Sequence, residues 1–102
     1  MFKKSKYLIT VRENGNIVFK EKEGYSFSVN GIYFGICKRG NAWDITEMSS
    51  GLFVTVALKR KDAIAEIKRI APSIETALKN SYNKKLIKMV QEEYEKRSQM
   101  TA

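Results

Sequence analysis

The chain has 102 residues, enough for one domain but not for two. Its 19 Lys and Arg against 11 Asp and Glu give a formal charge of +8, and it has no histidine and one cysteine, Cys37. The missing histidine excludes Ser-His-Asp and Cys-His mechanisms, and one cysteine excludes an internal disulfide or a thiolate zinc cluster. Because no stretch resembles a secretory signal or a membrane span of about 20 apolar residues, we expect a soluble, cytoplasmic protein without membrane contact.

Residues 7–56 alternate apolar and polar side chains between glycine-containing turns, a pattern typical of antiparallel hairpins. The clearest hairpin turns at Asn30-Gly31, a favoured type I′ pair. Its apolar pairs would be Val29 with Ile32, Phe27 with Phe34, and Tyr25 with Ile36. The spacing therefore predicts one apolar face for this hairpin.

The first hairpin allows two registers. A two-residue Asn14-Gly15 turn would place Ile9 opposite Lys20, whereas a three-residue loop over 13–15 with a glycine bulge places Val11 opposite Ile17 and Ile9 opposite Phe19. We predict the bulged register, because it keeps the apolar residues together.

Two further turns complete the predicted sheet. A turn at Arg39-Gly40 would bring Ile36 to Trp43 and Phe34 to Ile45, and a four-residue loop over 48–51 would bring Ile45 to Val54 and Trp43 to Val56. The result is a meander of five or six strands. Its expected core face carries Ile9, Val11, Ile17, Phe19, Phe27, Val29, Phe34, Ile36, Trp43, Ile45, Val54 and Val56.

After Leu58 the apolar period becomes helical. A first stripe runs from Ala63 through Ile67 to Ala71 and meets Pro72, which stops or kinks the helix; a short second piece would follow from Ile74 to Leu78. Ser81 is a plausible N-cap for a last helix with Leu86, Ile87, Val90 and Tyr94 buried. We predict a single α+β domain, with hairpins over 1–58, two or three helices over 59–98 on one sheet face, and a tail over 99–102.

Catalytic groups are scarce. Asp44 and Glu47 are three apart on a strand and so face opposite ways, and Glu66-Ile67-Lys68 matches the end of a metal-dependent nuclease motif but falls on a helix. Neither forms the paired carboxylates that acid-base or metal chemistry needs. We therefore expect no enzyme, no cofactor and no metal site.

The strand-to-helix junction carries Lys59, Arg60 and Lys61, where cations oppose the helix dipole. Two readings stay open: these are ordinary solvated side chains, or an anion binds there to the backbone and the three cations.

The sheet face opposite the expected core would mix cations, hydroxyls and aromatic rings. Such a face suits single-stranded nucleic acid, and equally a protein partner or a homodimer. Its candidate binding residues are Arg12, Lys20, Lys22, Tyr33 and Phe53, with Lys38 and Arg39 at one turn.

Three stretches, Trp43-Asp44-Ile45-Thr46, Ser50-Gly51-Leu52 and Lys61-Asp62-Ala63-Ile64, resemble a hairpin-plus-helix pattern in small proteins of bacteriophages and mobile elements. The resemblance covers about the central quarter of the chain and carries over no functional residue. It implies a setting in which many small proteins inhibit host defence systems, as anti-CRISPR and anti-restriction proteins do.

Together these observations predict a non-enzymatic basic binding protein of phage or mobile-element origin in the host bacterial cytoplasm. It would inhibit a host defence complex by binding its nucleic acid or its nucleic-acid channel. The alternatives are a general single-stranded nucleic-acid-binding accessory protein, or a structural protein that dimerises through the sheet. The charge excess is spread over both halves, with eight basic and five acidic residues through Leu58 and eleven and six after it. That spread favours recognition of a phosphate backbone or an acidic partner.

Overall fold

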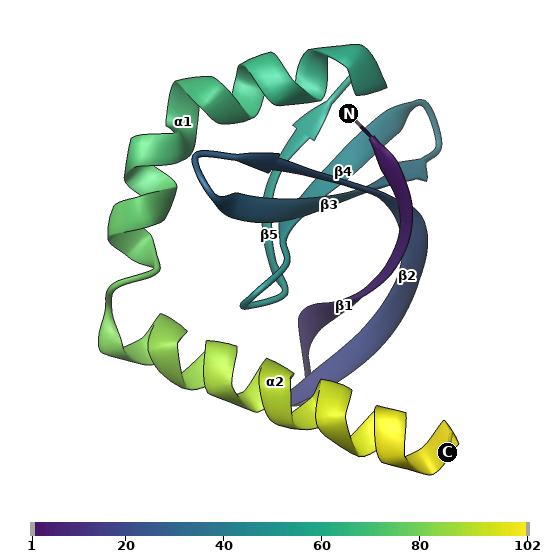
Figure 1. Ribbon diagram of the computed structural model, residues 1–102, viewed down its shortest axis with the longest axis vertical. Coiled ribbons are helices and arrows are strands. Elements are labelled where there is room, and N and C mark those ends of the chain that lie inside the picture. The colour runs from purple at the N-terminus through teal and green to yellow at the C-terminus, as the bar shows by residue number, and fades with distance from the viewer. Residues whose placement is uncertain (1, 102) are drawn as a thin grey trace.

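The computed structural model describes residues 2–101, as an antiparallel sheet followed by helices (Figure 1). The strands lie in the sheet in chain order. They are β1 (Lys3–Glu13), β2 (Asn16–Val29), β3 (Ile32–Arg39), β4 (Ala42–Glu47) and β5 (Leu52–Ala57), followed by the 3-10 turn η1 (Arg60–Asp62), α1 (Ala63–Ala77) and α2 (Ser81–Thr101). This five-stranded meander followed by helices confirms the predicted α+β class.

The hairpin of β2 and β3 has the predicted register. Val29 lies opposite Ile32, Phe27 opposite Phe34, and Tyr25 opposite Ile36. Asn30 and Gly31 both have left-handed φ angles, of 53° and 78°, as a type I′ turn requires. We call the sheet face that carries Phe27 and Phe34 the helix face, because α1 packs on it, and the opposite face the open face.

The first hairpin takes the register that we did not predict. Asn14 and Gly15 form a two-residue turn, with φ angles of 52° and 81°, so the bulged loop is wrong. Ile9 and Val11 therefore lie opposite Lys20 and Val18, on the open face. Local pairing misleads here because β1 is buried on both sides.

That double burial is visible at two adjacent residues of β1. Tyr7 and Leu8 point to opposite faces, and each is only 1% exposed. A strand with one solvated face cannot bury consecutive side chains. β1 therefore requires apolar side chains on both of its faces, whereas the bulged register would have placed them on one face only.

The turn between β3 and β4 lies one residue later than predicted. Gly40-Asn41 forms it, and Ile36 pairs with Ile45 rather than with Trp43. Phe34 consequently lies opposite Glu47.

The loop over 48–51 between β4 and β5 is as predicted, but the register beyond it is not. A bulge next to Ile45 places Thr55, not Val54, opposite that residue, and Ala57 lies opposite Trp43. Val56, predicted in the core, is instead 37% exposed. The extra residue shifts the register of the strand beyond it, so Val56 lies opposite Asp44. β-bulges change local pairing in sheets in this way.

The main core lies between the helix face and α1. Phe27, Val29, Phe34, Ile36 and Ile45 of the predicted core are buried there, against Ala63, Ile67 and Ala71 of α1. The remaining predicted core residues, Ile9, Val11, Ile17, Phe19, Trp43 and Val54, are half-buried.

Helix α1 does not stop at its proline. Pro72 lies inside it, and the separate piece predicted from Ile74 belongs to the same helix. Proline removes one backbone N–H and kinks a helix, and α1 bends along its course in Figure 1.

The long strands β1 and β2 curve together (Figure 1). Gly24 of β2 allows a close approach of β3, because a Cβ atom there would strike the carbonyl oxygen of Ile36. The curvature carries β1 to the far edge of the sheet, where the Thr10 N–H donates to Gly51 O at 2.8 Å and Thr10 Oγ1 donates to Ser50 O at 2.7 Å. The two edges of the sheet thus meet at one point.

Helix α2 covers the helix face of β1. Leu86 and Val90 are each 1% exposed, and the Tyr94 hydroxyl accepts a hydrogen bond of 2.7 Å from the Leu8 N–H. Asn80, not Ser81, caps this helix, because its Oδ1 accepts from the Asn83 N–H at 2.8 Å.

The C-terminal tail that we predicted from residue 99 belongs to α2 through Thr101, and residue 102 lies outside the described residues. No helix within residues 2–101 combines the length and apolar character needed to cross a bilayer.

Candidate nucleic-acid interface

The side chain of Arg60, in η1, lies over three aromatic rings, which come from the residue before β1, from β2 and from β4. Its guanidinium carbon lies 4.5 Å from the ring centre of Tyr25, 5.3 Å from that of Phe2 and 5.8 Å from that of Trp43. Each such cation–π contact is worth about 0.5–2 kcal/mol, depending on its exposure. Through these contacts Arg60 links the start of the helical region to Phe2, to β2 and to β4.

Two lysines extend this arrangement. The Lys38 ammonium lies 6.0 Å from the centre of the Trp43 ring, and Lys4 lies opposite Tyr25 in the β1–β2 register, on the same face. We call Phe2, Lys4, Tyr25, Lys38, Trp43 and Arg60 the basic–aromatic surface. Its three rings are half-buried, so each one still has area open to a ligand.

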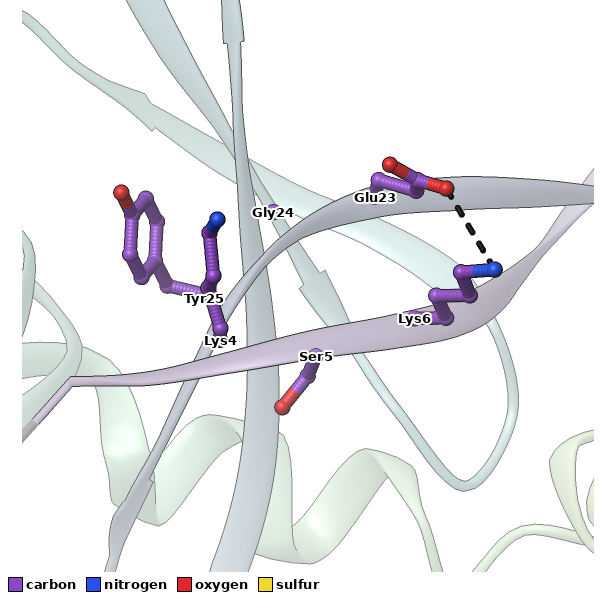
Figure 2. A pocket seen from close by; sticks show the side chains of 6 residues that line it. All are labelled: Lys4, Ser5, Lys6, Glu23, Gly24 and Tyr25. Atoms are coloured by element: carbon purple, nitrogen blue, oxygen red, sulfur yellow. Dashed lines mark ion pairs between the residues drawn. The ribbon is translucent and has the colours of Figure 1, made fainter.

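A hollow of about 480 Å³ adjoins this surface, lined by Lys4, Ser5, Lys6, Glu23, Gly24 and Tyr25. Figure 2 shows the Tyr25 ring beside Lys4, while Lys6 reaches Glu23 in an ion pair of 3.5 Å. Both partners of that pair are well exposed, so it contributes little to stability and can open for a ligand. The hollow thus offers an aromatic wall and two ammonium groups.

The cations near this surface are mostly without counter-charges. Among residues 2–101, ion pairs engage Lys6, Lys20, Arg39, Arg69 and Arg97. Lys4, Lys38, Lys59 and Lys61 make none within that range, and all four are exposed. The local field is therefore positive and open to a polyanion.

The predicted junction residues only partly come together. Arg60 lies in the basic–aromatic surface, and Lys59 and Lys61 flank it on the chain as exposed side chains. The Arg60 guanidinium lies over the rings, so the three cations do not converge on the helix N-terminus as the anion hypothesis required. Lys38 belongs to the surface through Trp43.

The other predicted residues lie elsewhere. Arg12 is on the helix face, not the open face, and its guanidinium donates to the Tyr82 hydroxyl of α2 at 2.8 Å. Lys20 is paired with Glu13 at 2.6 Å. Tyr33 is 63% exposed on the open face, while Lys22, Arg39 and Phe53 line a separate cavity there with Lys38.

Sequence reasoning missed the aromatic half of this surface. It assigned Trp43 and Tyr25 to the core face and gave Phe2 no role. A usable signal was present, since Lys4 and Lys38 lie two or five residues from one of these rings along the chain. What the sequence could not supply is that the three rings gather around Arg60.

The two carboxylates of β4, Asp44 and Glu47, are engaged in structural contacts. Asp44 accepts two hydrogen bonds from Arg39, at 2.7 and 3.0 Å. Glu47 is 3% exposed and accepts hydrogen bonds from the backbone and hydroxyl groups of Ser49 and Ser50. Among residues 2–101, no three Cys, Asp or Glu side chains lie where they could share a metal ion.

Comparisons with known proteins return no match: no protein-family model, no curated protein and no solved structure resembles the chain. Function must therefore be argued from the geometry and charges of this chain.

Proposed function

We propose that this protein is a non-enzymatic nucleic-acid-binding protein that holds single-stranded DNA or RNA on its basic–aromatic surface. The observation that carries the proposal is the contact of Arg60 with three rings, with Lys4 and Lys38 beside two of them. Proteins that bind single strands without sequence preference combine cations along the backbone with rings on which bases stack.

The arrangement suits a flexible strand better than a duplex. The rings come from separate segments, namely the residue before β1, β2 and β4, and bases stack on rings only when they are unpaired. Lys4 and Lys6 in the adjoining hollow, with Lys59 and Lys61 nearby on the chain, would contact phosphates. Phosphate contacts of this kind do not depend on the base sequence. The spread of positive charge over the chain also favours binding without sequence preference.

Binding is best measured by two signals on labelled 20-nucleotide DNA and RNA. Trp43 is the single tryptophan of the chain, so its fluorescence reports base stacking at this surface directly. Fluorescence anisotropy at several salt concentrations gives the number of phosphate contacts. Saturable binding with tryptophan quenching and a salt slope is expected; no binding at low salt contradicts the proposal.

Matched variants locate the site. Replacing Lys4 and Lys38 by glutamine should lower the slope of log K against log salt by about 1.4, since each single-strand phosphate contact adds roughly 0.7. The control replaces Lys84 and Lys85, exposed lysines of α2, with the same loss of charge. Equal losses in both double variants would show diffuse attraction and refute a localised site.

The finer proposal is that the protein comes from a phage or mobile element and acts in the cytoplasm of a bacterial host. There it would inhibit a defence complex by occupying its nucleic acid or the channel that holds it. A purified CRISPR or restriction complex should then lose its labelled nucleic acid when this protein is added. If the Lys4→Gln, Lys38→Gln variant inhibits the complex as well as the parent protein does, the inhibition does not depend on the basic–aromatic surface.

Dimerisation through the sheet is a second candidate, favoured by the edge strand β5. Residues 52–58 carry no charge, and Phe53 and Leu58 are 60% and 79% exposed. Natural edge strands usually carry charges that prevent pairing. Sedimentation at several concentrations should show a dimer that Phe53→Lys abolishes, and a monomer throughout would exclude it.

A further inference from the structure

Arg60 is held over the basic–aromatic surface by aromatic rings. Its guanidinium carbon lies 4.5 Å from the ring centre of Tyr25, 5.3 Å from that of Phe2 and 5.8 Å from that of Trp43. Within residues 2–101 the guanidinium makes no ion pair and no hydrogen bond. A guanidinium has five N–H donors, so the rings position this side chain and leave all five donors without an acceptor among the described residues.

The guanidinium nitrogens are open to solvent. In the part of the chain that the structure describes, no buried side-chain nitrogen or oxygen lacks a hydrogen-bond partner. Arg60 is half-buried, and its guanidinium nitrogens have no partner there, so solvent must reach each of them. A ligand can therefore bind these donors without displacing an acceptor of the protein.

The other four arginines of the chain have acceptors. Arg12 donates to a tyrosine hydroxyl, and Arg39, Arg69 and Arg97 donate to carboxylates. Of the five arginines, all of which lie within residues 2–101, Arg60 is the one whose donors have no acceptor in that range. A ligand would supply the acceptor that the other four find within the protein.

The shape of the guanidinium defines the acceptor. Its planar fork donates two parallel N–H groups to a pair of oxygens on one phosphate or one carboxylate. The surrounding rings favour the phosphate of a nucleic-acid strand, because the bases next to that phosphate can contact them, whereas an acidic peptide brings no flat group. Lys4, opposite Tyr25, and Lys38, beside Trp43, add positive charge for the neighbouring phosphates.

The rings also lower the cost of binding. Ordering a long, flexible side chain at an interface costs conformational entropy. The ring contacts already restrict Arg60 in the free protein. We therefore expect its phosphate contact to be stronger than that of an exposed lysine such as Lys59 or Lys61.

We propose that Arg60 anchors the bound strand by donating two N–H groups to the two free oxygens of one phosphate, while the bases on either side of that phosphate contact the neighbouring rings. This inference rests on the proposed function and assigns one residue of the surface a defined contact. Lysine cannot replace arginine in this contact, because an ammonium group is a point charge without the planar fork.

A substitution that keeps the charge tests the fork. Arg60→Lys should bind the labelled 20-nucleotide strand about tenfold more weakly than the parent protein, with an unchanged slope of log K against log salt. Arg60→Gln should bind no more tightly than Arg60→Lys, and its slope should be smaller by about 0.7. The matched control is Arg69→Lys, on an exposed arginine of α1 outside the basic–aromatic surface, which should bind like the parent.

The outcomes separate this inference from the proposed function. If Arg60→Lys binds the strand as tightly as the parent, or Arg69→Lys loses as much affinity as Arg60→Lys, the anchoring role is overturned and nucleic-acid binding stands. If the parent binds no strand at low salt, both proposals fail.

NMR of the parent protein observes the contact directly and does not depend on the folding of a variant. The Nε–H signal of Arg60 should shift when octathymidylate is added, because a phosphate oxygen accepts from the guanidinium. The methylphosphonate analogue carries the same bases on an uncharged backbone and should leave this signal unchanged. An equal shift with both strands, or no shift with either, would overturn the proposal.

A peptide of eight glutamates tests the choice of phosphate over carboxylate. Because it offers charge and no bases, it should bind at least tenfold more weakly than octathymidylate and should not quench the fluorescence of Trp43. Equal affinity for the peptide and the strand would refute the phosphate assignment and identify an acidic protein segment as the partner.

Discussion

Replacing Gly35 by alanine would place a methyl group against the ring of Tyr7. A Cβ atom at this position would lie 2.5 Å from Tyr7 Cζ and 2.6 Å from both Cε atoms. Carbon atoms prefer separations of about 3.5–4.0 Å, so the two groups overlap by roughly 1 Å. The ring cannot yield easily, because Tyr7 is 1% exposed.

The free-energy change follows from two opposing effects. Overpacking of this kind typically costs about 1–3 kcal/mol. Gly35 has no left-handed φ, so alanine adds no backbone strain and restricts the unfolded chain, which returns about 0.4–1 kcal/mol. We expect a net loss of about 1–2 kcal/mol, out of the roughly 5–15 kcal/mol that a domain of this size possesses.

Urea unfolding followed by Trp43 fluorescence measures this loss, and a double-mutant cycle identifies its cause. In a Tyr7→Leu background the ring is gone, so Gly35→Ala should cost about 1 kcal/mol less than in the parent protein. The control is Gly40→Ala, where a Cβ meets no atom within 4 Å and only the left-handed φ of 61° opposes it. Its cost should be equal in both backgrounds. A cost of Gly35→Ala that is the same with and without the ring would refute the reasoning.

Three further outcomes are expected. Glu47→Gln should lower the free energy of unfolding by about 2 kcal/mol, because a buried carboxylate loses charge-assisted hydrogen bonds from Ser50 and its neighbour; an unchanged urea midpoint would count against it. Tyr94→Phe should expose the unpaired Leu8 N–H to faster hydrogen exchange and cost about 1 kcal/mol, and an unchanged exchange rate at that amide would disagree. Burial raises the pKa of Tyr7 and of Tyr94 above the ordinary 10.0, so these tyrosines ionise first in the unfolded chain. The free energy of unfolding should therefore be constant below pH 10 and fall above it, by up to about 1.4 kcal/mol per pH unit for each tyrosine. Urea titrations at alkaline pH would measure this slope, which Tyr7→Phe should reduce.

The hairpins show where sequence reasoning holds and where it fails. Asn30-Gly31 predicts its register correctly, because the residues next to the turn, 27–29 and 32–34, bury only one face and the apolar pairs agree with the turn. Asn14-Gly15 has the same turn chemistry, and we rejected it because it separates Ile9 and Val11 from the core face. Those residues are in fact needed on the open face, where curvature brings β1 over the sheet.

The candidate site shows the same division. The sequence draws attention to Lys38 and Arg60, which the structure places at the same ring, Trp43. It also spreads the candidates over a face that they do not share. Arg12 lies on the other face, and Lys20 and Arg39 are in ion pairs. The aromatic rings that contact Arg60 come from β2, from β4 and from Phe2, before β1. No local sequence pattern connects these positions.

The sequence by itself determined the charge of +8, the absence of histidine, and the order of strands and helices. Side-chain alternation and turn residues act over a few positions, so these features can be read locally. Only the tertiary structure decided that β1 is buried on both faces, that Thr10 joins the two sheet edges, and that Arg60 lies among three rings. These depend on sheet curvature and on contacts between residues up to several dozen positions apart, for which the chain carries no local signal.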